Sequence, residues 1–538
     1  MVSEEVIPES FTKCLARLGI IAALVEGFGI VDLVNARLPR LQHRTLTHGD
    51  VVLALILNGL GFTQRWLYLF SAWFENKPLE RLFGKEVTAA DITDDVIGRT
   101  LDAIEEYGPE RLYQEIISQI FLVTRLGYHQ VHLDITSFNF YGASDTTSTV
   151  HVAQGYPEDG RWGLNRSGLG LIVNQAGVPL SMRFLSDNGD DKVALPEMLA
   201  RFRSRVEFPE PLYYIADPAS YVGDSFKKIG EETFFITLVP GTTGEQQALL
   251  RRDLPLAPLA DPRYSFFETE SCYGGVHQKW VVYHSAADHA KQEKALEKRR
   301  SKEDERVKKA LAHLNNREFA CEADALAEAE RWIRTYPLYE FESVSVVTRW
   351  QQAPGRRGRP EKDGVPGAVY LLAASVRPDE AARVAERAAL GRFVLATNDL
   401  DLAAEDLLAR YGNRGVVEHG FRFLNDSSFT ISDLFLENNG RIEALGMMMT
   451  LMLAVYSLGE YQLRRRLEHL GKTVPDRAGK PTAKPTLKWV MTFFDGVVEY
   501  HRYDLATGTV QYEGILNMSK RCWDVVEAFG PICKKYYS

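Results

Sequence analysis

The feature that most constrains the fold of this chain is a succession of strand-like and helix-like segments that starts near residue 129, stops at residue 240 and resumes at residue 392. Residues 131–138 alternate apolar and polar side chains, as a half-buried strand does. The segments that follow lie at 168–174, 178–185, 195–202, 212–216, 219–229 and 233–239. Three strands in hairpin succession, followed by helix, strand, helix and strand, predict an α/β fold in which a mixed sheet carries helices on its faces.

The regions around this succession differ in pattern. Apolar residues recur at helical spacing from about residue 12 to 120, and Thr93-Asp94-Asp95 is a suitable start for one long helix that runs to Leu122. Residues 240–390 hold strand-like runs and a charged helix at 288–314. We therefore predict a helical N-terminal domain, a first core segment, a largely β insertion domain, a second core segment and a basic C-terminal region. Their bounds are 1–125, 126–240, 241–390, 391–460 and 461–538.

The overall charge is mildly acidic, because 63 Lys and Arg face 72 Asp and Glu, a net of −9. This balance excludes a protein that coats nucleic acid with a uniformly basic surface, but it does not exclude local basic surfaces. Two basic regions occur. Residues 291–309 hold nine basic and five acidic side chains, and residues 461–538 have a net charge of +5.

The five cysteines are scattered, without the Cys and His spacings of a structural zinc site, which favours a reducing compartment. The two most apolar stretches, 51–57 and 446–458, are shorter than the ~20 residues of a membrane span. We therefore expect a cytoplasmic protein without a membrane partner.

Three acidic residues stand where a catalytic metal site needs them. Asp134 lies in the middle of an apolar strand, Asp217 follows the fourth strand, and Glu418 lies on a later helix. A buried carboxylate is unfavourable unless it is paired or binds a metal. Oxygen ligands that converge from separate elements are the arrangement that two divalent cations require for phosphoryl transfer.

Glu418 shares one helix face with Tyr411 and Arg414, because offsets of three and seven residues fall within about 60° of each other. An alternative is a solvated helix face with an ordinary Arg–Glu pair, which stabilises a helix by a few tenths of a kcal/mol.

Taken together, these segments resemble the transposases of bacterial insertion sequences. The similarity is to the DDE cut-and-paste group with the Tyr-Arg-Glu-Lys signature, and within it to the 1634-type insertion sequences. It extends over most of the chain, from a motif around Asp94 to a motif around Arg441. The segments that carry it are Asp94-Asp95-x2-Gly98-Arg99-x-Leu101-Asp102, Leu133-Asp134-Ile135-Thr136-Ser137, Tyr214-Ile215-Ala216-Asp217, Thr397-Asn398-Asp399, Tyr411-x2-Arg414-x3-Glu418, Phe421-Arg422-Phe423-Leu424 and Arg441-Ile442-Glu443-Ala444-Leu445.

The resemblance implies a ribonuclease-H-like core, split by an insertion between the second and third acidic residues. It implies that Asp134, Asp217 and Glu418 bind two Mg²⁺ or Mn²⁺ ions, and that Tyr411 and Arg414 contact phosphates of the transposon end. The implied reaction is hydrolytic nicking at terminal inverted repeats, followed by strand transfer into target DNA. The implied partner is double-stranded DNA, bound by a homodimer and associated with the nucleoid, with no small-molecule cofactor. The resemblance also implies that the helical N-terminal domain serves DNA binding or dimerisation.

The sequence departs from the signature at one position. The lysine expected seven residues after the glutamate is Asn425, which brings no charge to a phosphate. Arg422 lies four residues after Glu418, on the same helix face, and is our candidate for the missing cation.

The insertion contains two further features of interest. Gly355-Arg356-Arg357-Gly358-Arg359-Pro360 resembles the core of an AT-hook, in which Arg357 and Arg359 would enter a narrow minor groove, and the alternative is a flexible basic loop. Trp280 and Trp350 sit beside strands of the insertion, where a related transposase group stacks an aromatic on a flipped base. We expect core packing for both tryptophans.

The function we predict is that of a DDE transposase, a DNA endonuclease and strand transferase. Two other functions are open: a catalytically silent descendant that is kept as a DNA-binding or regulatory protein, and a cellular nuclease with the same core.

Overall fold

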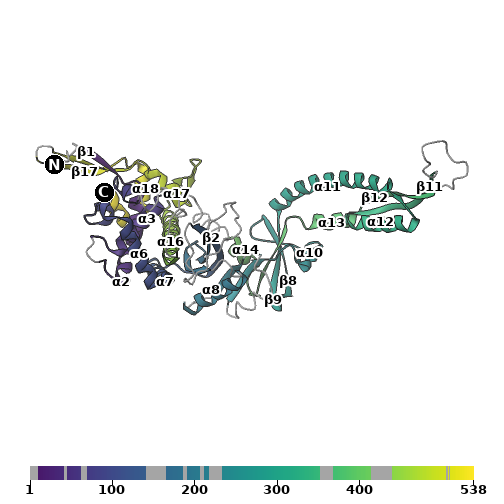
Figure 1. The fold of residues 1–538 in the computed structure, drawn as a ribbon, viewed down its shortest axis with the longest axis horizontal. Helices are drawn as coiled ribbons and strands as arrows, with labels where there is room; N and C mark the ends of the chain where they lie inside the picture. Colours follow the sequence, from purple (N-terminus) through teal and green to yellow (C-terminus); the bar gives the residue numbers. More distant parts are fainter. Residues whose placement is uncertain are drawn as a thin grey trace. The chain divides into compact units, whose positions relative to one another are not determined.

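A computed structural model describes residues 10–41, 45–61, 70–140, 165–185, 191–205, 211–216, 218, 233–351, 367–412, 439–504, 507 and 509–538. At 134–140, 165–167, 185, 191–196, 205, 351 and 439 it describes the backbone alone. The chain divides into two compact units, which are treated separately below. The first comprises Met1–Phe235 and Ala409–Ser538, and the second comprises Ile236–Leu408. Figure 1 labels their elements.

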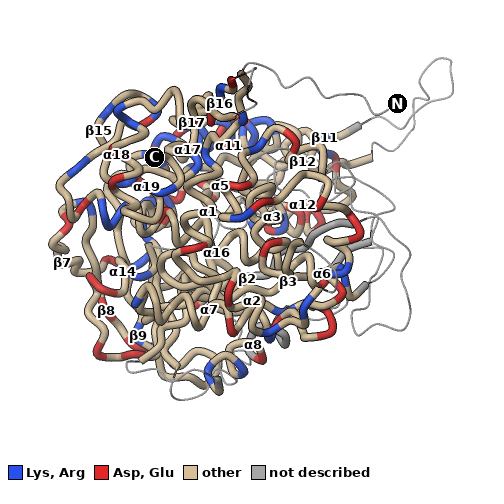
Figure 2. Tube along the Cα trace, turned by 90° about the vertical axis from the view of Figure 1, so that its left-hand side faces the viewer, with Lys and Arg blue, Asp and Glu red and all other residues tan. Residues whose placement is uncertain are grey.

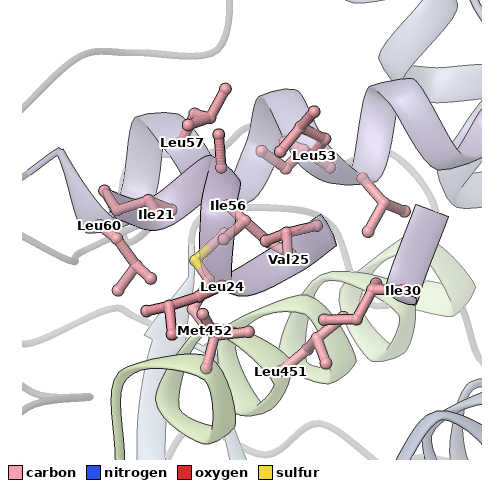
Figure 3. Packing of buried hydrophobic residues seen from close by; sticks show 14 of the residues in the cluster. Ile21, Leu24, Val25, Ile30, Leu53, Ile56, Leu57, Leu60, Leu451 and Met452 are labelled. Atoms are coloured by element: carbon pink, nitrogen blue, oxygen red, sulfur yellow. The ribbon is translucent and has the colours of Figure 1, made fainter. Parts of the chain in front are cut away.

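The first unit is built around a helical core. Its longest helix is α16, and α1 and α3 pack directly against α16 (Figure 3). Leu24 of α1, Ile56 of α3 and Met452 of α16 are among the side chains buried there. The helices of this unit are α1 (Leu18–Gly27), α2 (Ile30–Arg37), α3 (His48–Leu60), α4 (Phe70–Phe74), α5 (Leu79–Phe83), α6 (Asp94–Tyr107), α7 (Pro109–Thr124), α8 (Asp191–Arg205), α16 (Asn439–His469), α17 (Leu487–Met491), α18 (Lys520–Phe529) and α19 (Pro531–Tyr537), with short 3₁₀ turns at Ala89–Asp91 and Thr492–Phe494.

Helix α16 is long and apolar enough to cross a membrane, as judged by length and composition. However, 83% of its most apolar window is buried within the protein. Its apolar surface is therefore explained by its place in the core of this unit.

The sequence between residues 93 and 124 forms two helices, where we expected one. The predicted start is confirmed, because the Thr93 side chain accepts a hydrogen bond from the backbone N–H of Val96. Helix α6 then ends at Tyr107. Gly108 follows with a φ of +97°, which is unfavourable for other residues, and Pro109 begins α7. The apolar spacing continues across the break, so periodicity alone does not reveal it.

The two ends of the chain meet in this unit. Strand β1 (Ser10–Cys14) pairs antiparallel with β16 (Val498–Tyr503), which pairs with β17 (Val510–Leu516). The Tyr537 hydroxyl donates a hydrogen bond to the carbonyl of Ala16 at 2.7 Å. A two-stranded pair, β14 (Val474–Pro475) with β15 (Pro481–Thr482), completes this region.

The predicted mixed sheet is present in the first unit. Its strands are β2 (Gln130–Phe140), β3 (Asn165–Asn174), β4 (Pro179–Leu185), β5 (Leu212–Ala216) and the start of β6 (Thr233–Leu238). In the order β4-β3-β2-β5, the first three strands pair antiparallel, whereas β2 and β5 are parallel. Apolar side chains of β3 and β4 join the helical core. The prediction of an α/β fold with a large mixed sheet is confirmed.

The second unit continues from the end of β6. Strand β13 (Arg392–Thr397) pairs antiparallel with β6 and with β9 (Val276–Ser285), and β9 continues to β8 (Tyr264–Tyr273) and β7 (Ala257–Pro258). A second sheet has the order β10-β12-β11, formed by Glu318–Phe319, Gly367–Pro378 and Tyr339–Gln351. The helices are α10 (Gly244–Leu250), α11 (Ala286–Asn315), α12 (Glu322–Arg334), α13 (Glu380–Ala388) and α14 (Ala404–Gly412), whose last residues belong to the first unit. Helix α11 alone has 30 residues, so this segment contains more helix than our prediction of a largely β insertion implies.

Candidate functional site

The structure describes two of the predicted site positions. Asp134 lies in β2, where the backbone alone is described, and Tyr411 lies in the last turn of α14. The remaining candidates lie outside the described residues: Asp217, Arg357, Arg359, Arg414, Glu418, Arg422 and Asn425.

The strands that lead to the first two predicted carboxylates are neighbours. Strands β2 and β5 pair in parallel, with Gln130 opposite Tyr213 and His132 opposite Ile215. Strand β5 is buried along its whole length, and Val131 and His132 of β2 are buried as well. Two strands that are far apart in sequence therefore run in the same direction, side by side, toward residues 134 and 217.

Helix α14 is attached to these two strands through Arg410. The Arg410 guanidinium lies over the ring of Tyr213, with 4.2 Å between its central carbon and the ring centroid. The Gln130 side-chain amide donates a hydrogen bond to the carbonyl of Arg410 at 2.9 Å. One residue of α14 thus contacts both strands, and Tyr411 follows directly.

This attachment is largely buried. Gln130 is 1% exposed, and its Nε2 also lies 3.0 Å from Nε2 of His132. The Nη1 atom of Arg410 is buried and has no hydrogen-bond partner among the described residues. A buried guanidinium N–H without an acceptor is unfavourable, so this atom marks a place where an anion or an acceptor side chain fits.

Comparison with protein families identifies the chain. The family described as "Transposase DDE domain" matches residues 134–455, which is more than half of the chain. The chain belongs to this transposase family. A second family, described as a domain of unknown function (DUF4277), matches residues 10–118.

No curated protein matches the chain. Among solved structures, it is similar to a chain in the cryo-EM structure of the piggyBac transposase synaptic complex with hairpin DNA. That likeness has 9% sequence identity and a TM-score of 0.36, and it covers 86% of this chain and 77% of the other. The prediction that the protein is a DDE transposase is confirmed by the family match, whereas membership of the 1634-type group stays a prediction.

Two motifs that we singled out at opposite ends of the similarity touch each other in the transposase. Arg441 forms a two-pronged ion pair with Asp102, at 2.5 and 2.8 Å, and its guanidinium packs against Gly98. Its hydrogen bonds lower the pKa of Asp102. Beside this pair, burial raises the pKa of Glu443, with further contributions from Glu110 and Glu105.

Trp280 and Trp350, two tryptophans of the transposase's second unit, differ in burial. Trp280 is fully buried and donates a hydrogen bond to the side-chain oxygen of Gln278 at 3.2 Å, which confirms core packing. Trp350 is 68% exposed, so our expectation of core packing was wrong there. It lies on the same face of β11 as Val344 and Val346, which pack against the cluster formed with α11 and α12, but it lies beyond the end of that cluster.

A different acidic cluster has the spacing of a metal site. Ligand atoms of Glu499, His501 and Glu513 lie within 4.8 Å of one another on β16 and β17. However, Arg81 forms ion pairs with both carboxylates. The guanidinium offsets part of the negative charge that a cation would meet, so we interpret this cluster as an ion-pair network that fixes α5 to the sheet.

Sequence reasoning missed Gln130 and Arg410. A glutamine at the start of a strand and an arginine at the end of a helix are common, and no spacing links them. The one available signal was position: Gln130 lies four residues before Asp134, and Tyr213 lies four residues before Asp217.

Proposed function

We propose that this transposase cleaves DNA at the terminal inverted repeats of its element and transfers the freed ends into target DNA, with Asp134, Asp217 and Glu418 as the metal ligands. The observation that carries the proposal is the parallel register of β2 and β5. The register pairs residues that differ by 83 in number, from Gln130 with Tyr213 to His132 with Ile215. Continued by two residues, the same offset would bring Asp134 opposite Asp217.

This register suits a two-cation site. Neighbouring strands are ~4.8 Å apart, so two carboxylates at matching positions are close enough to share cations. Mg²⁺ and Mn²⁺ prefer such oxygen ligands. Because strand positions alternate between faces, position 134 shares a face with Gln130, whose side chain contacts α14. The segment that contains Glu418 follows α14, which supports a third ligand on that face.

The chain's own residues hold and orient the DNA in this proposal. Arg410 anchors α14 at the starts of β2 and β5, and Tyr411 and Arg414 follow it as phosphate contacts. Arg422 supplies the positive charge that Asn425 lacks. The two cations, when bound, would activate the attacking hydroxyl and stabilise the leaving oxygen.

We further propose that the core is ribonuclease-H-like and that a homodimer bridges two element ends. Three antiparallel strands followed by a parallel one support the core assignment. Light scattering of the protein with end DNA tests the dimer. One chain bound per end, with no bridged species, contradicts it.

The decisive experiment is cleavage of a duplex that carries the inverted repeat flanking the gene. Wild-type protein with Mg²⁺ is expected to cut at the repeat boundary, and Asp134→Ala to abolish cutting while DNA binding is retained. Glu197→Ala, which removes an exposed carboxylate on α8, is the matched control and is expected to cut normally. Absence of wild-type cutting with Mg²⁺ or Mn²⁺ would contradict the activity and favour a catalytically silent DNA-binding protein. Cutting by Asp134→Ala would refute the metal assignment.

A further inference from the structure

Helix α11 of the second unit has two faces of opposite character. Its buried side chains are Leu296, Val307 and Leu314, which lie close to one line at ~100° per residue. Figure 1 shows α11 running beside β12, and Leu314 joins the cluster between α11, α12 and that sheet. The charged residues of α11 fall into two groups, one near this buried line and one on the opposite face of the helix.

Two arginines near the buried side of α11 form ion pairs within the protein. Arg300 pairs with Glu386 of α13 at 3.0 Å, and Arg299 pairs with the same carboxylate. Asp304 of α11 forms a further ion pair with Arg383 of α13 at 2.7 Å. These ion pairs fix α11 to α13 and leave these charges little capacity for an external partner.

The face opposite the buried line is a row of lysines, which we call the lysine face. All of its members are exposed, fall within about 60° of one line, and form no ion pair among the described residues. They are Lys291, Lys294, Lys298, Lys302, Lys308 and Lys309. Glu305 is the one acidic residue of α11 within the same angle. Figure 2 marks the basic positions along the chain in blue.

The lysine face is unfavourable for the isolated protein. Lys294, Lys298 and Lys302 follow one another at four-residue intervals, and like charges at this spacing each destabilise a helix by a few tenths of a kcal/mol. The short side chains of Ala287 and Ala290 leave a shallow hollow beside the first lysines. An anionic partner would remove the repulsion and reach close to the helix backbone.

The helix holds this face in a fixed position. Near its start, the backbone N–H of Gly391 donates to the side chain of Gln292 at 2.8 Å. At its end, the Asn315 side chain bonds both backbone groups of Ala374, at 2.9 and 3.1 Å. The lysines are therefore arranged before any partner binds, which lowers the entropy cost of binding.

We propose that the lysine face of α11 binds the phosphate backbone of double-stranded DNA without reading its sequence. The inference rests on the proposed transposase reaction, which needs DNA beyond the recognised end. From Lys291 to Lys309 the face is ~27 Å long at 1.5 Å per residue. A duplex carries one negative charge per ~1.7 Å of axis, both strands counted, so a face of this length lies alongside several phosphates. Lysine acts on phosphate as a point charge, which positions DNA but does not specify its sequence.

The test measures binding of the full-length protein to a random-sequence duplex by fluorescence anisotropy over a range of salt concentrations. The changed protein carries Lys291→Gln, Lys294→Gln, Lys298→Gln and Lys302→Gln. Its affinity is expected to fall, and the slope of log affinity against log salt to decrease by ~0.9 for each phosphate that the protein no longer neutralises. The same four positions changed to Arg form the matched control and are expected to keep both affinity and slope. Because these side chains are exposed and mutually repulsive, the Gln protein should melt no lower than wild type.

A gain of function provides a second, independent measurement. Glu305→Lys removes the one acidic side chain of the face and adds a cation, so it is expected to strengthen duplex binding and steepen the salt slope. Unchanged binding in both the Gln and the Glu305→Lys proteins would overturn the proposal. Loss of binding to a folded RNA or to anionic vesicles, with duplex binding unaffected, would also overturn it. Binding is measured in EDTA, which removes the divalent cations that cleavage requires. If duplex binding is intact but the cleavage experiment fails, the result counts against the proposed reaction and not against the lysine face.

Discussion

The attachment of α14 to the strands of the core can be tested with Gln130→Ala. Gln130 is 1% exposed, and its amide is a donor to the carbonyl of Arg410, 2.9 Å away. The hydrogen bond is partly buried, so leaving that carbonyl without its donor costs about 1 kcal/mol. Since 1.4 kcal/mol is a factor of ten, the equilibrium for release of α14 from the sheet should rise by roughly 5-fold.

Hydrogen exchange measures this release directly. The peptide that covers α14, residues 404–412, is expected to exchange faster in Gln130→Ala by about that factor. Cleavage of the element end is expected to slow in parallel, because α14 leads to the segment that holds Glu418.

Val131→Ala is the matched control for this experiment. Val131 is fully buried one residue along the same strand, and strand alternation puts it on the opposite face. Its removal also destabilises the protein by roughly 1–3 kcal/mol, but it leaves the contact with Arg410 in place. Equal exchange of α14 in the two variants, at equal melting temperature, would refute the view that Gln130 holds α14.

Three other outcomes follow from the sequence and the structure. Arg422→Ala should impair end cleavage much more than Asn425→Ala, and equal, mild effects would reject Arg422 as the replacement cation. Glu443→Gln should raise the melting temperature at pH 7: burial raises the pKa of Glu443 in the folded protein, so its ionisation disfavours folding, and the difference should vanish as the pH falls below about 4.5. Gly49→Ala should lower the stability of the protein, because its Cβ would lie 2.4 Å from a backbone carbonyl of α2. The steric cost is about 1–3 kcal/mol, and the better helix propensity of alanine offsets up to ~1 kcal/mol of it. Gly244→Ala on α10 should not destabilise the protein, because the added Cβ would lie in open space. Thermal unfolding of each variant beside wild type checks the last two.

The strands of the core were predictable because each is an apolar run between turn signals. The structure gives β5 and β13 the bounds that the sequence predicted, 212–216 and 392–397. The pairing of β1 with β16 was not predictable, because an apolar pattern shows that a face is buried but not which distant segment covers it. The same limit explains Trp350: alternation identifies its face, but not that the covering cluster ends at Val346.

The candidate site was predictable to the extent that its chemistry is unusual for its surroundings. An aspartate within an apolar strand, such as Asp134, needs an explanation, and a metal supplies one. Gln130 and Arg410 carry no such signal, because their roles arise from contacts over 280 residues of sequence. The contacts that would position the proposed site are therefore tertiary, whereas the residues that we propose as metal ligands are visible in the sequence.

Charge shows why counting residues is not enough to locate a DNA surface. The C-terminal region has a net charge of +5, yet several of its cations are already paired: Lys472 with Glu527 at 2.8 Å, and Lys535 with Glu26 at 2.9 Å. The six lysines of α11 form no such pair among the described residues, although that helix also carries five acidic side chains between 291 and 309. A cation that is already paired gains less from a phosphate, because it must first give up its partner. The six lysines on one face of α11, unpaired within the described part of the chain, therefore identify a candidate DNA surface that the net charge of the chain does not reveal.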